Sequence, residues 1–379
     1  MNTSRRRRMV RLGAVTAAVV AGMLLQVACG SGNQKGKAVD EFPKGGVMPA
    51  ETGRHDGVYM AWPTAEVWED MADGVQNDIA KIARTIAEYE PVYLFAGAAQ
   101  VEKARKQVGP DVTVIEQPVD DLWMRDTAPT FVRAGEGLAA VDFGFNGWGG
   151  KQEHQRDADV ARRVAEVAGV PRVKASLVAE GGSLETDGDG TLMATESSLV
   201  NDNRNPGKSR DDIERELKRL LGVQKVIWFK GVKDKEITDY HIDGIARFTS
   251  PGTVLLSAPA PGTEPNDFTR AYEQAKEVLA NSTDAKGRKL RVVEVPEVDP
   301  AKVGQEDIDD FSGTYVNYYV ANGAVIMPKF GDEEADRKAA DIVAELYPGR
   351  EVRQLSISTL VQGGGAIHCS TQQLPLRTP

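Results

Sequence analysis

Apolar residues follow two patterns along the chain, and together these patterns predict helices alternating with short strands. Residues 78–88 have the spacing of an amphipathic helix, with four apolar side chains on one face: Ile79, Ile82, Ala83 and Ile86. Short apolar runs at 91–96 and 112–115 are typical of buried strands.

The rest of the chain continues this alternation. Helices are predicted over 211–221 (ended by Gly222), 268–280 and 333–346, and strands over 225–229 and 325–328. Residues 183–195 predict a hairpin that turns at Asp187-Gly188-Asp189-Gly190. The two aspartates also resemble part of a calcium loop, but the other ligands are missing and the hairpin is favoured. No sequence repeat is visible, so the pattern predicts a mixed α/β fold and goes no further.

The first 46 residues differ from the rest. Five arginines between positions 5 and 11 precede an uncharged stretch, 12–28, that ends at Cys29. This order predicts an export signal over 1–29, because the stretch is short for a spanning helix of about 20 residues. Residues 25–29 resemble a bacterial lipobox with Gln26 in an unusual place. Cys29 is therefore expected to carry lipid and to anchor the protein to the outer face of the cytoplasmic membrane.

Plain secretion and an uncleaved anchor helix are the alternatives, and the adjacent arginines also fit a twin-arginine route. Residues 30–46 are rich in Gly, Ser, Lys and Asp and predict a flexible tether. The folded domain is expected over 47–375, followed by a short tail at 376–379.

Composition and charge exclude several classes of protein. The chain has 379 residues, of which 41% are hydrophobic and 27% charged, as in soluble globular proteins. Its net charge of −10 and pI near 5.2 disfavour binding to nucleic acid. Two cysteines are too few for a disulfide scaffold.

Cys369 is the only thiol once Cys29 is set aside. It follows Gly363-Gly364-Gly365, and a tight turn of this kind could place it at a helix N-terminus, where a thiolate is favoured. The alternative is an inert buried cysteine. His368 is expected to point to the opposite face of the segment.

Three further sites carry polar side chains suited to catalysis. If 241–243 is a strand, His241 and Asp243 share a face, and the carboxylate would orient the imidazole and raise its basicity. Asp126 follows Trp123, whose aromatic face suits a cation or an alkyl chain, and Glu180 precedes two glycines. Read alone, each has an ordinary structural alternative as a cap, core or turn residue. His55 and His154 are weaker candidates.

The order of these motifs resembles the agmatine deiminase family, which is grouped with the Porphyromonas-type peptidylarginine deiminases. The resemblance runs from Val47 to Pro375 and includes residues 60–63, 144–149, 203–206 and 315–319. It implies the pentein fold, a five-bladed α/β propeller of ββαβ modules with about 65 residues each.

The resemblance also implies roles for the candidate residues. Cys369 would be the nucleophile and His241 the general acid and base. Asp126 and Asp243 would hold the guanidinium of a small substrate or of an arginine side chain. Glu180 would position His241 or the substrate, and Trp123 would flank the alkyl chain. The reaction would hydrolyse the guanidinium to a ureido group and ammonia without a metal or organic cofactor, and a homodimer is compatible with the family.

Four residues beside the motifs depart from the family pattern, and they concern the substrate rather than the reaction: Ala128, Tyr240, Gly244 and Ala366. Agmatine is the first expectation. Peptidyl or free arginine, giving citrulline, is the alternative, since export is unusual for agmatine metabolism. Amidino transfer and a tethered binding protein for guanidinium compounds or polyamines remain further alternatives. Cys369 beside His241 and Asp243 favours the hydrolase, because a binding protein has no use for a nucleophile.

Overall fold

The computed structural model describes residues 46–305 and 311–377. The predicted signal, Cys29, nearly all of the tether and the last two residues of the tail lie outside this part of the chain. Within the described residues, no helix combines the length and apolar character needed to cross a membrane.

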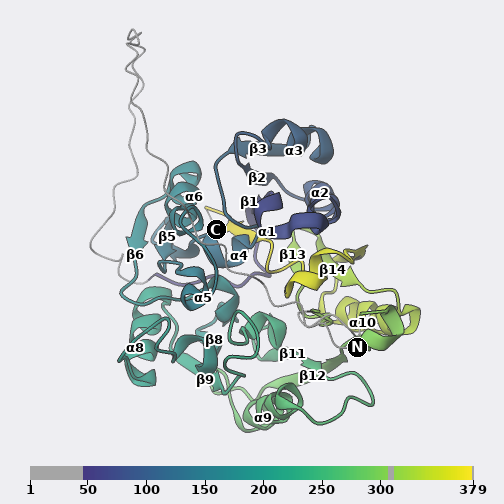
Figure 1. The fold of residues 1–379 in the computed structure, drawn as a ribbon. Coiled ribbons are helices and arrows are strands. Elements are labelled where there is room, and N and C mark those ends of the chain that lie inside the picture. The colour runs from purple at the N-terminus through teal and green to yellow at the C-terminus, as the bar shows by residue number, and fades with distance from the viewer. Residues whose placement is uncertain (1–45, 306–310, 378–379) are drawn as a thin grey trace. The chain divides into compact units, whose positions relative to one another are not determined.

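Within the described residues, five small sheets share one pattern, in which an antiparallel pair is followed by a parallel strand, and one sheet adds a second parallel strand (Figure 1). Four of the sheets have three strands each: β4 (Thr130–Ala134), β5 (Gly137–Asp142) and β6 (Arg172–Lys174); β7 (Glu185–Thr186), β8 (Thr191–Thr195) and β9 (Lys225–Phe229); β10 (Ala246–Ser250), β11 (Thr253–Ala258) and β12 (Arg291–Pro296); β13 (Tyr319–Ala321), β14 (Ala324–Lys329) and β15 (Glu351–Ser356).

The fifth sheet joins the two ends of the domain. Its order is β16-β1-β2-β3, from β16 (Gln372–Pro375), β1 (His55–Ala61), β2 (Val92–Ala96) and β3 (Val112–Glu116). The strand β16 is antiparallel to β1, with Tyr59 opposite Gln372, and β1 is parallel to β2. The antiparallel pair that other sheets make from consecutive strands is therefore made here from the first and last strands.

Helices connect the parallel strands within the sheets. The longer ones are α2 (Ala72–Ala87), α3 (Val101–Val108), α6 (Val160–Ala168), α8 (Arg210–Leu221), α9 (Asp267–Asn281) and α10 (Glu333–Leu346). A crossover of this kind is what parallel pairing requires. The repeated antiparallel-then-parallel unit is the ββαβ module of the pentein fold, so the fold expected from the family resemblance is confirmed.

Most local predictions are confirmed because they rest on local signals. α10 and β9 have the predicted bounds, and α8 ends at Gly222 in the left-handed conformation (φ 67°). The hairpin between β7 and β8 forms at the predicted aspartates, where Asp187 accepts the N–H groups of Asp189 and Thr191. Helix α2 begins at Ala72, six residues before the predicted start, since Val75 and other buried residues extend its apolar face.

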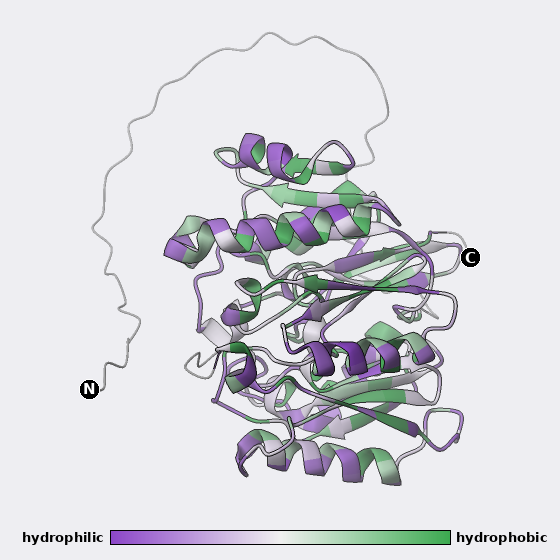
Figure 2. Ribbon diagram, turned by 90° about the vertical axis from the view of Figure 1, so that its right-hand side faces the viewer, coloured by the Kyte–Doolittle hydropathy of each residue, from purple (hydrophilic) through white to green (hydrophobic). Residues whose placement is uncertain are grey.

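Apolar side chains gather between each sheet and its helices. Figure 2 shows hydrophobic residues concentrated in the strands and hydrophilic residues along the outer sides of the helices. One cluster joins α2 and the strands β1, β2 and β3 to Trp123, Trp148 and Ile367, and Cys369 packs against it. Trp123 and Cys369 therefore lie against the packed interior.

Candidate active site

Cys369 lies in a turn between a short 3-10 helix, Leu360–Gly363, and β16. The predicted position at a helix N-terminus is wrong, because residues after Cys369 enter a strand and no helix follows. Burial, together with the charges of Asp243 and Asp126, raises the pKa of the thiol well above its ordinary value. The thiol is therefore neutral at neutral pH beside these carboxylates.

Each of the three glycines before Cys369 occupies a position that disfavours a side chain, for a different reason in each case. A Cβ on Gly363 would lie 2.2 Å from the Trp68 ring, and Gly364 is in the left-handed region at φ 87°. A Cβ on Gly365 would lie 2.6 Å from Cζ3 of Trp123 and 3.1 Å from Cβ of Cys369. Glycine at 365 thus lets the Trp123 indole approach the thiol-bearing residue.

His241 and Asp243 converge with Asp126 on Gly182. A Cβ on Gly182 would lie 2.6 Å from Nδ1 of His241, 2.9 Å from Oδ1 of Asp126 and 3.1 Å from Oδ2 of Asp243. The predicted strand at 241–243 is wrong, since Ile242–Gly244 is a 3-10 turn. The two side chains reach the same point because the turn folds them together.

His241 donates its hydrogen bond to Glu180 rather than to Asp243, which corrects the pairing expected from sequence. Its Nε2 lies 3.2 Å from Oε2 of Glu180, and its Nδ1 lies 3.7 Å from Oδ1 of Asp126. Burial lowers the pKa of His241, but the charge of Asp126 and the hydrogen bond to Glu180 outweigh it and raise the pKa to about 9. The imidazole is therefore protonated at neutral pH.

Glu180 is completely buried and is shared between His241 and Arg204, whose Nε donates to Oε1 at 2.9 Å. Burial opposes its ionisation, but the hydrogen bond from His241 and the charge of Arg204 hold the pKa of Glu180 below its usual value. Arg204 also binds Asp239. Glu180 is thus a fixed carboxylate behind the imidazole.

The two carboxylates beside Gly182 have different electrostatic environments. Asp126 accepts hydrogen bonds from Nε1 of Trp148 at 2.9 Å and from the N–H of Gly182 at 3.0 Å. Burial raises the pKa of Asp126 to about 6, against the attraction of His241. For Asp243 burial acts in the same direction, but the hydrogen bond from His368 outweighs it and lowers the pKa.

His368 does not point away from the site, as an extended segment would require. Because the segment is a turn, its Nδ1 lies 2.7 Å from Oδ2 of Asp243, and Sγ of Cys369 lies 3.4 Å from the same oxygen. The other ring nitrogen lies 2.9 Å from Oε1 of Glu51, which also pairs with Arg125 and Arg247.

Comparisons with known proteins identify this arrangement. Residues 47–375 match the Porphyromonas-type peptidyl-arginine deiminase family. The chain belongs to this family. It is 38% identical over 360 residues to the agmatine deiminase of Medicago truncatula, a match that covers 86% of this chain and 96% of the other. The agmatine deiminase of Pseudomonas aeruginosa is 38% identical over 352 residues, covering 86% and 95%.

The fold of the family is also found in solved structures. The agmatine deiminase of Enterococcus faecalis superposes with a TM-score of 0.83 at 32% identity, covering 89% of this chain and 99% of the other. Like its relatives in this family, the protein is a hydrolase that acts on guanidino C–N bonds.

Four residues beside the catalytic candidates carry no role in the sequence analysis: Glu51, Trp148, Asn317 and His368. Trp148 and Asn317 lie in segments that match the family. The motifs therefore drew attention to these residues but did not indicate what their side chains do. Trp148 takes a left-handed conformation (φ 53°) that turns its indole N–H toward Asp126. Glu51 lies in residues 47–52, where the resemblance begins, but the motif assigned it no role, and the fold places it beside His368.

One departure from the family pattern has a backbone explanation. Tyr240 stands where glycine is common in the family, and its φ is +70°. This conformation is unfavourable for a bulky residue and natural for glycine. The ring of Tyr240 packs edge-on against Phe268 at 5.1 Å between centroids.

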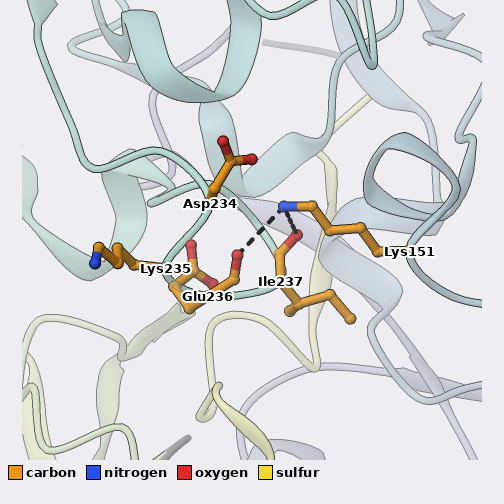
Figure 3. A pocket seen from close by; sticks show the side chains of 5 residues that line it. All are labelled: Lys151, Asp234, Lys235, Glu236 and Ile237. Carbon is orange, nitrogen blue, oxygen red and sulfur yellow. Dashed lines mark hydrogen bonds between the residues drawn. The ribbon is translucent and has the colours of Figure 1, made fainter.

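A cavity of about 270 Å³ lies beside the segment that leads into His241. It is lined by Lys151 and by residues 234–237. Figure 3 shows the Lys151 ammonium turned toward the carbonyls of Glu236 and Ile237, at 3.3 and 3.1 Å. Lys151 also pairs with Asp239 at 2.8 Å, so it fixes this segment next to Arg204.

Other candidates lie elsewhere. His55 packs with Tyr319 and Glu90, and His154 contacts the carbonyl of Gln152. In the described part of the chain, no group of three or more His, Cys, Asp or Glu residues is arranged to hold a metal ion.

Proposed function

We propose that the protein hydrolyses the guanidinium group of agmatine to N-carbamoylputrescine and ammonia through a covalent intermediate on Cys369. The convergence of one imidazole and two carboxylates on Gly182, with the thiol 3.4 Å from one of them, supports the hydrolysis of a guanidinium, and the similarity to agmatine deiminases supports agmatine as its bearer. The reaction needs no metal or organic cofactor, because the nucleophile, the acid and the cation-binding groups all come from the chain.

Asp126 and Asp243 would bind the substrate cation. A guanidinium is charged at every physiological pH and is planar, so it suits two carboxylates that approach from different sides. Desolvating such a cation is costly unless carboxylates pair with it. Trp123, held beside Cys369 by Gly365, would flank the alkyl chain.

Binding would also prepare the nucleophile. Asp126 and Asp243 oppose ionisation of the thiol. A bound guanidinium neutralises that effect, so the thiol gives its proton to solvent water when the substrate is in place. The thiolate then attacks the central carbon and forms the C–S bond.

His241 would serve both halves of the reaction. Protonated at first, it gives its proton to the departing nitrogen, which leaves as ammonia, and an amidino-thioether remains. The neutral imidazole then takes a proton from water, and the resulting hydroxide adds to the same carbon. The C–S bond breaks with its electron pair returning to sulfur, and the protonated ureido product gives one proton to the thiolate before release, which restores the neutral thiol.

The substrate is tested by ammonia release from agmatine, free arginine and an arginine-containing peptide. Turnover of agmatine with the highest kcat/KM supports the proposal. Preference for arginine or the peptide would instead make the protein a citrulline-forming deiminase. The same assay on Cys369→Ser should show no turnover, while circular dichroism shows an unchanged fold. Ureido product from this variant at more than a few per cent of the wild-type rate would contradict the covalent route.

We also propose that the protein is exported and anchored through lipid on Cys29, on the strength of the arginine-rich start, the uncharged stretch and the small residues after the cysteine. Partition into detergent and a mass spectrum of the N-terminal peptide test this. An unmodified N-terminus in the cytoplasm would contradict it. Light scattering of the purified protein tests the expected homodimer.

A further inference from the structure

The guanidinium of Arg204 lies between two acidic residues, and each of them is connected to His241 in a different way. Its Nε donates to Oε1 of Glu180 at 2.9 Å, and the other oxygen of Glu180 lies 3.2 Å from Nε2 of His241. Its Nη1 binds Oδ2 of Asp239, and its Nη2 donates to the carbonyl of Thr238 at 2.9 Å. One side chain thus joins the partner of the imidazole to the backbone that leads into the imidazole.

The backbone just before His241 has an unfavourable conformation. Asp239 and Tyr240 are consecutive residues in the left-handed region, at φ 62° and 70°. Residues other than glycine rarely adopt this conformation, and it persists only where the surrounding structure holds it. If the contacts that hold this pair were lost, the segment would relax and His241 would move with it.

Neighbouring segments hold the pair in place. The carbonyl oxygens of Asp239 and Tyr240 accept hydroxyl groups from the segment 195–197, at 2.6 and 2.9 Å. The carboxylate of Asp239 pairs with Lys151 at 2.8 Å and also with Arg204. The strained pair is therefore fixed by its backbone and by one side chain.

Arg204 differs from the other cation of this group. The side chains of Arg204, Glu180 and Asp239 are all completely buried. Among the described residues, Arg204 is the one cation that pairs with both carboxylates, whereas Lys151 pairs with Asp239 alone. A guanidinium carries its N–H donors in fixed directions, so Arg204 sets the position of one carboxylate relative to the other.

We propose that Arg204 is a positioning residue for His241. It keeps the imidazole in place through the carboxylate of Glu180 and through the backbone at Asp239. The proposal rests on the role of His241 as general acid and base in the reaction above. His241 gives a proton to the leaving nitrogen and later takes one from water, and both transfers need the ring within hydrogen-bond reach of the reacting atom.

Kinetics separate this role from a merely structural one. In Arg204→Met we expect kcat on the best substrate to fall by about 10²-fold, since a small misplacement of a reacting group has an effect of this size. Because Asp126 and Asp243 hold the substrate cation, KM should change by less than about threefold. A wild-type kcat in Arg204→Met would overturn the proposal, and so would a loss that lies in KM alone.

Two further variants are the controls. Lys151→Met removes the other cation from Asp239 but leaves Glu180 paired, so kcat should fall by less than in Arg204→Met. Arg172→Met removes a partly buried cation from Asp142, at 3.3 Å in the sheet of β4, β5 and β6, and should leave kcat within a few-fold of the wild type. Equal falls in the three variants would overturn the proposal, since they would reflect lost stability and not a displaced imidazole.

Spectroscopy on the wild type covers the case in which Arg204→Met does not fold. Nε of Arg204 donates to the carboxylate that His241 also contacts, so its NMR resonance should move as His241 loses its proton at its pKa of about 9. The Nε resonance of Arg172 should stay in place over the same pH range. An Arg204 resonance that does not follow the titration of the imidazole would overturn the proposal.

The same measurement separates this proposal from the proposed function. If the wild type releases no ammonia from any guanidino substrate but the Arg204 resonance follows the imidazole, the proposed function fails and the link between Arg204 and His241 stands. If ammonia is released but the resonance does not follow the imidazole, the function stands and Arg204 does not position His241.

Discussion

The Nδ1 atom of His368 lies 2.7 Å from Oδ2 of Asp243, on the carboxylate oxygen that the thiol of Cys369 also contacts. The opposite ring nitrogen faces Glu51 at 2.9 Å. Because both nitrogens face carboxylate oxygens, the imidazole donates to both only when it carries two protons. His368 therefore fixes the orientation of Asp243 from behind and favours its ionised form.

Removing the charge of Asp126 or of Asp243 should damage catalysis far more than folding. An unpaired buried cation costs about 3–5 kcal/mol, which corresponds to a fall of about 10²–10⁴ in kcat/KM. Asp126→Asn and Asp243→Asn should each show this fall on the best substrate, with little change in Tm. A near-normal kcat/KM in either variant would contradict its place in the cation site.

Asp336→Asn is the control for these two variants. Asp336 is also buried, but it binds the Tyr315 hydroxyl and the N–H groups of Phe330 and Gly331 beside α10. This substitution should lower Tm and leave kcat/KM within a few-fold of the wild type.

Substrate affinity should depend on the ionisation of Asp126. Its pKa of about 6 means that it takes up a proton as the pH falls through 6, and a neutral carboxyl no longer pairs with a guanidinium. Calorimetry on Cys369→Ser, which binds without turnover, should show affinity for agmatine falling toward about tenfold per pH unit below pH 6. Constant affinity between pH 4.5 and 8 would show that Asp126 does not contact the cation.

Gly182 should tolerate no side chain. A Cβ there would lie within 3.1 Å of His241, Asp126 and Asp243 together, so these groups must move apart. Gly182→Ala should lower kcat/KM by about 10² or more, since small displacements of reacting groups have effects of this size. Gly244→Ala, in the neighbouring 3-10 turn, meets no atom within 4 Å and should retain activity. Equal kinetics for the two variants would argue against convergence at Gly182.

Glu51 should matter for stability in a pH-dependent way. Burial opposes its ionisation, but Arg125, Arg247 and His368 outweigh it and hold the pKa of Glu51 well below its usual value. A carboxyl pKa lowered by folding contributes stability above the unfolded value near 4.5, and that stability is lost as the pH falls. Glu51→Gln should cost about 3–5 kcal/mol at pH 7.

The measurement for Glu51 is chemical denaturation at several pH values. The difference between Glu51→Gln and wild type should be largest near neutrality and shrink below pH 4.5. Glu88→Gln, which removes a surface pair with Arg353, should have little effect at any pH. A Glu51 effect that does not vary with pH would mean that packing, not charge, is lost.

The sequence predicts helices and strands well where the signal is local, as in α10 and β9. The arrangement of five modules could not be predicted from the sequence pattern, because each module fills its core with different residues and only the backbone repeats. The family resemblance supplied that arrangement instead. The periodicity of apolar residues alone predicted only a mixed α/β fold.

The candidate site was also predicted only in part from the sequence. The motifs led to Cys369, His241 and Asp243, but the geometry assumed for them was wrong, since turns rather than a strand and a helix bring them together. Glu51 and Asn317 lie far from Cys369 in the sequence and have common side chains with no fixed spacing. Only the packing of separate modules places them beside the thiol and its neighbours.

Because β1 pairs with β16, the site around the thiol is completed only late in the synthesis of the chain. The ribosome makes β1 first and β16 last among these strands, so the edge of β1 waits unpaired while nearly the whole domain is made. Cys369, just ahead of β16, takes its position against Asp243 and Asn317 only when that edge closes. In a partly made or truncated chain, the nucleophile is therefore not assembled. Turnover begins only after the first and last strands of the domain have paired.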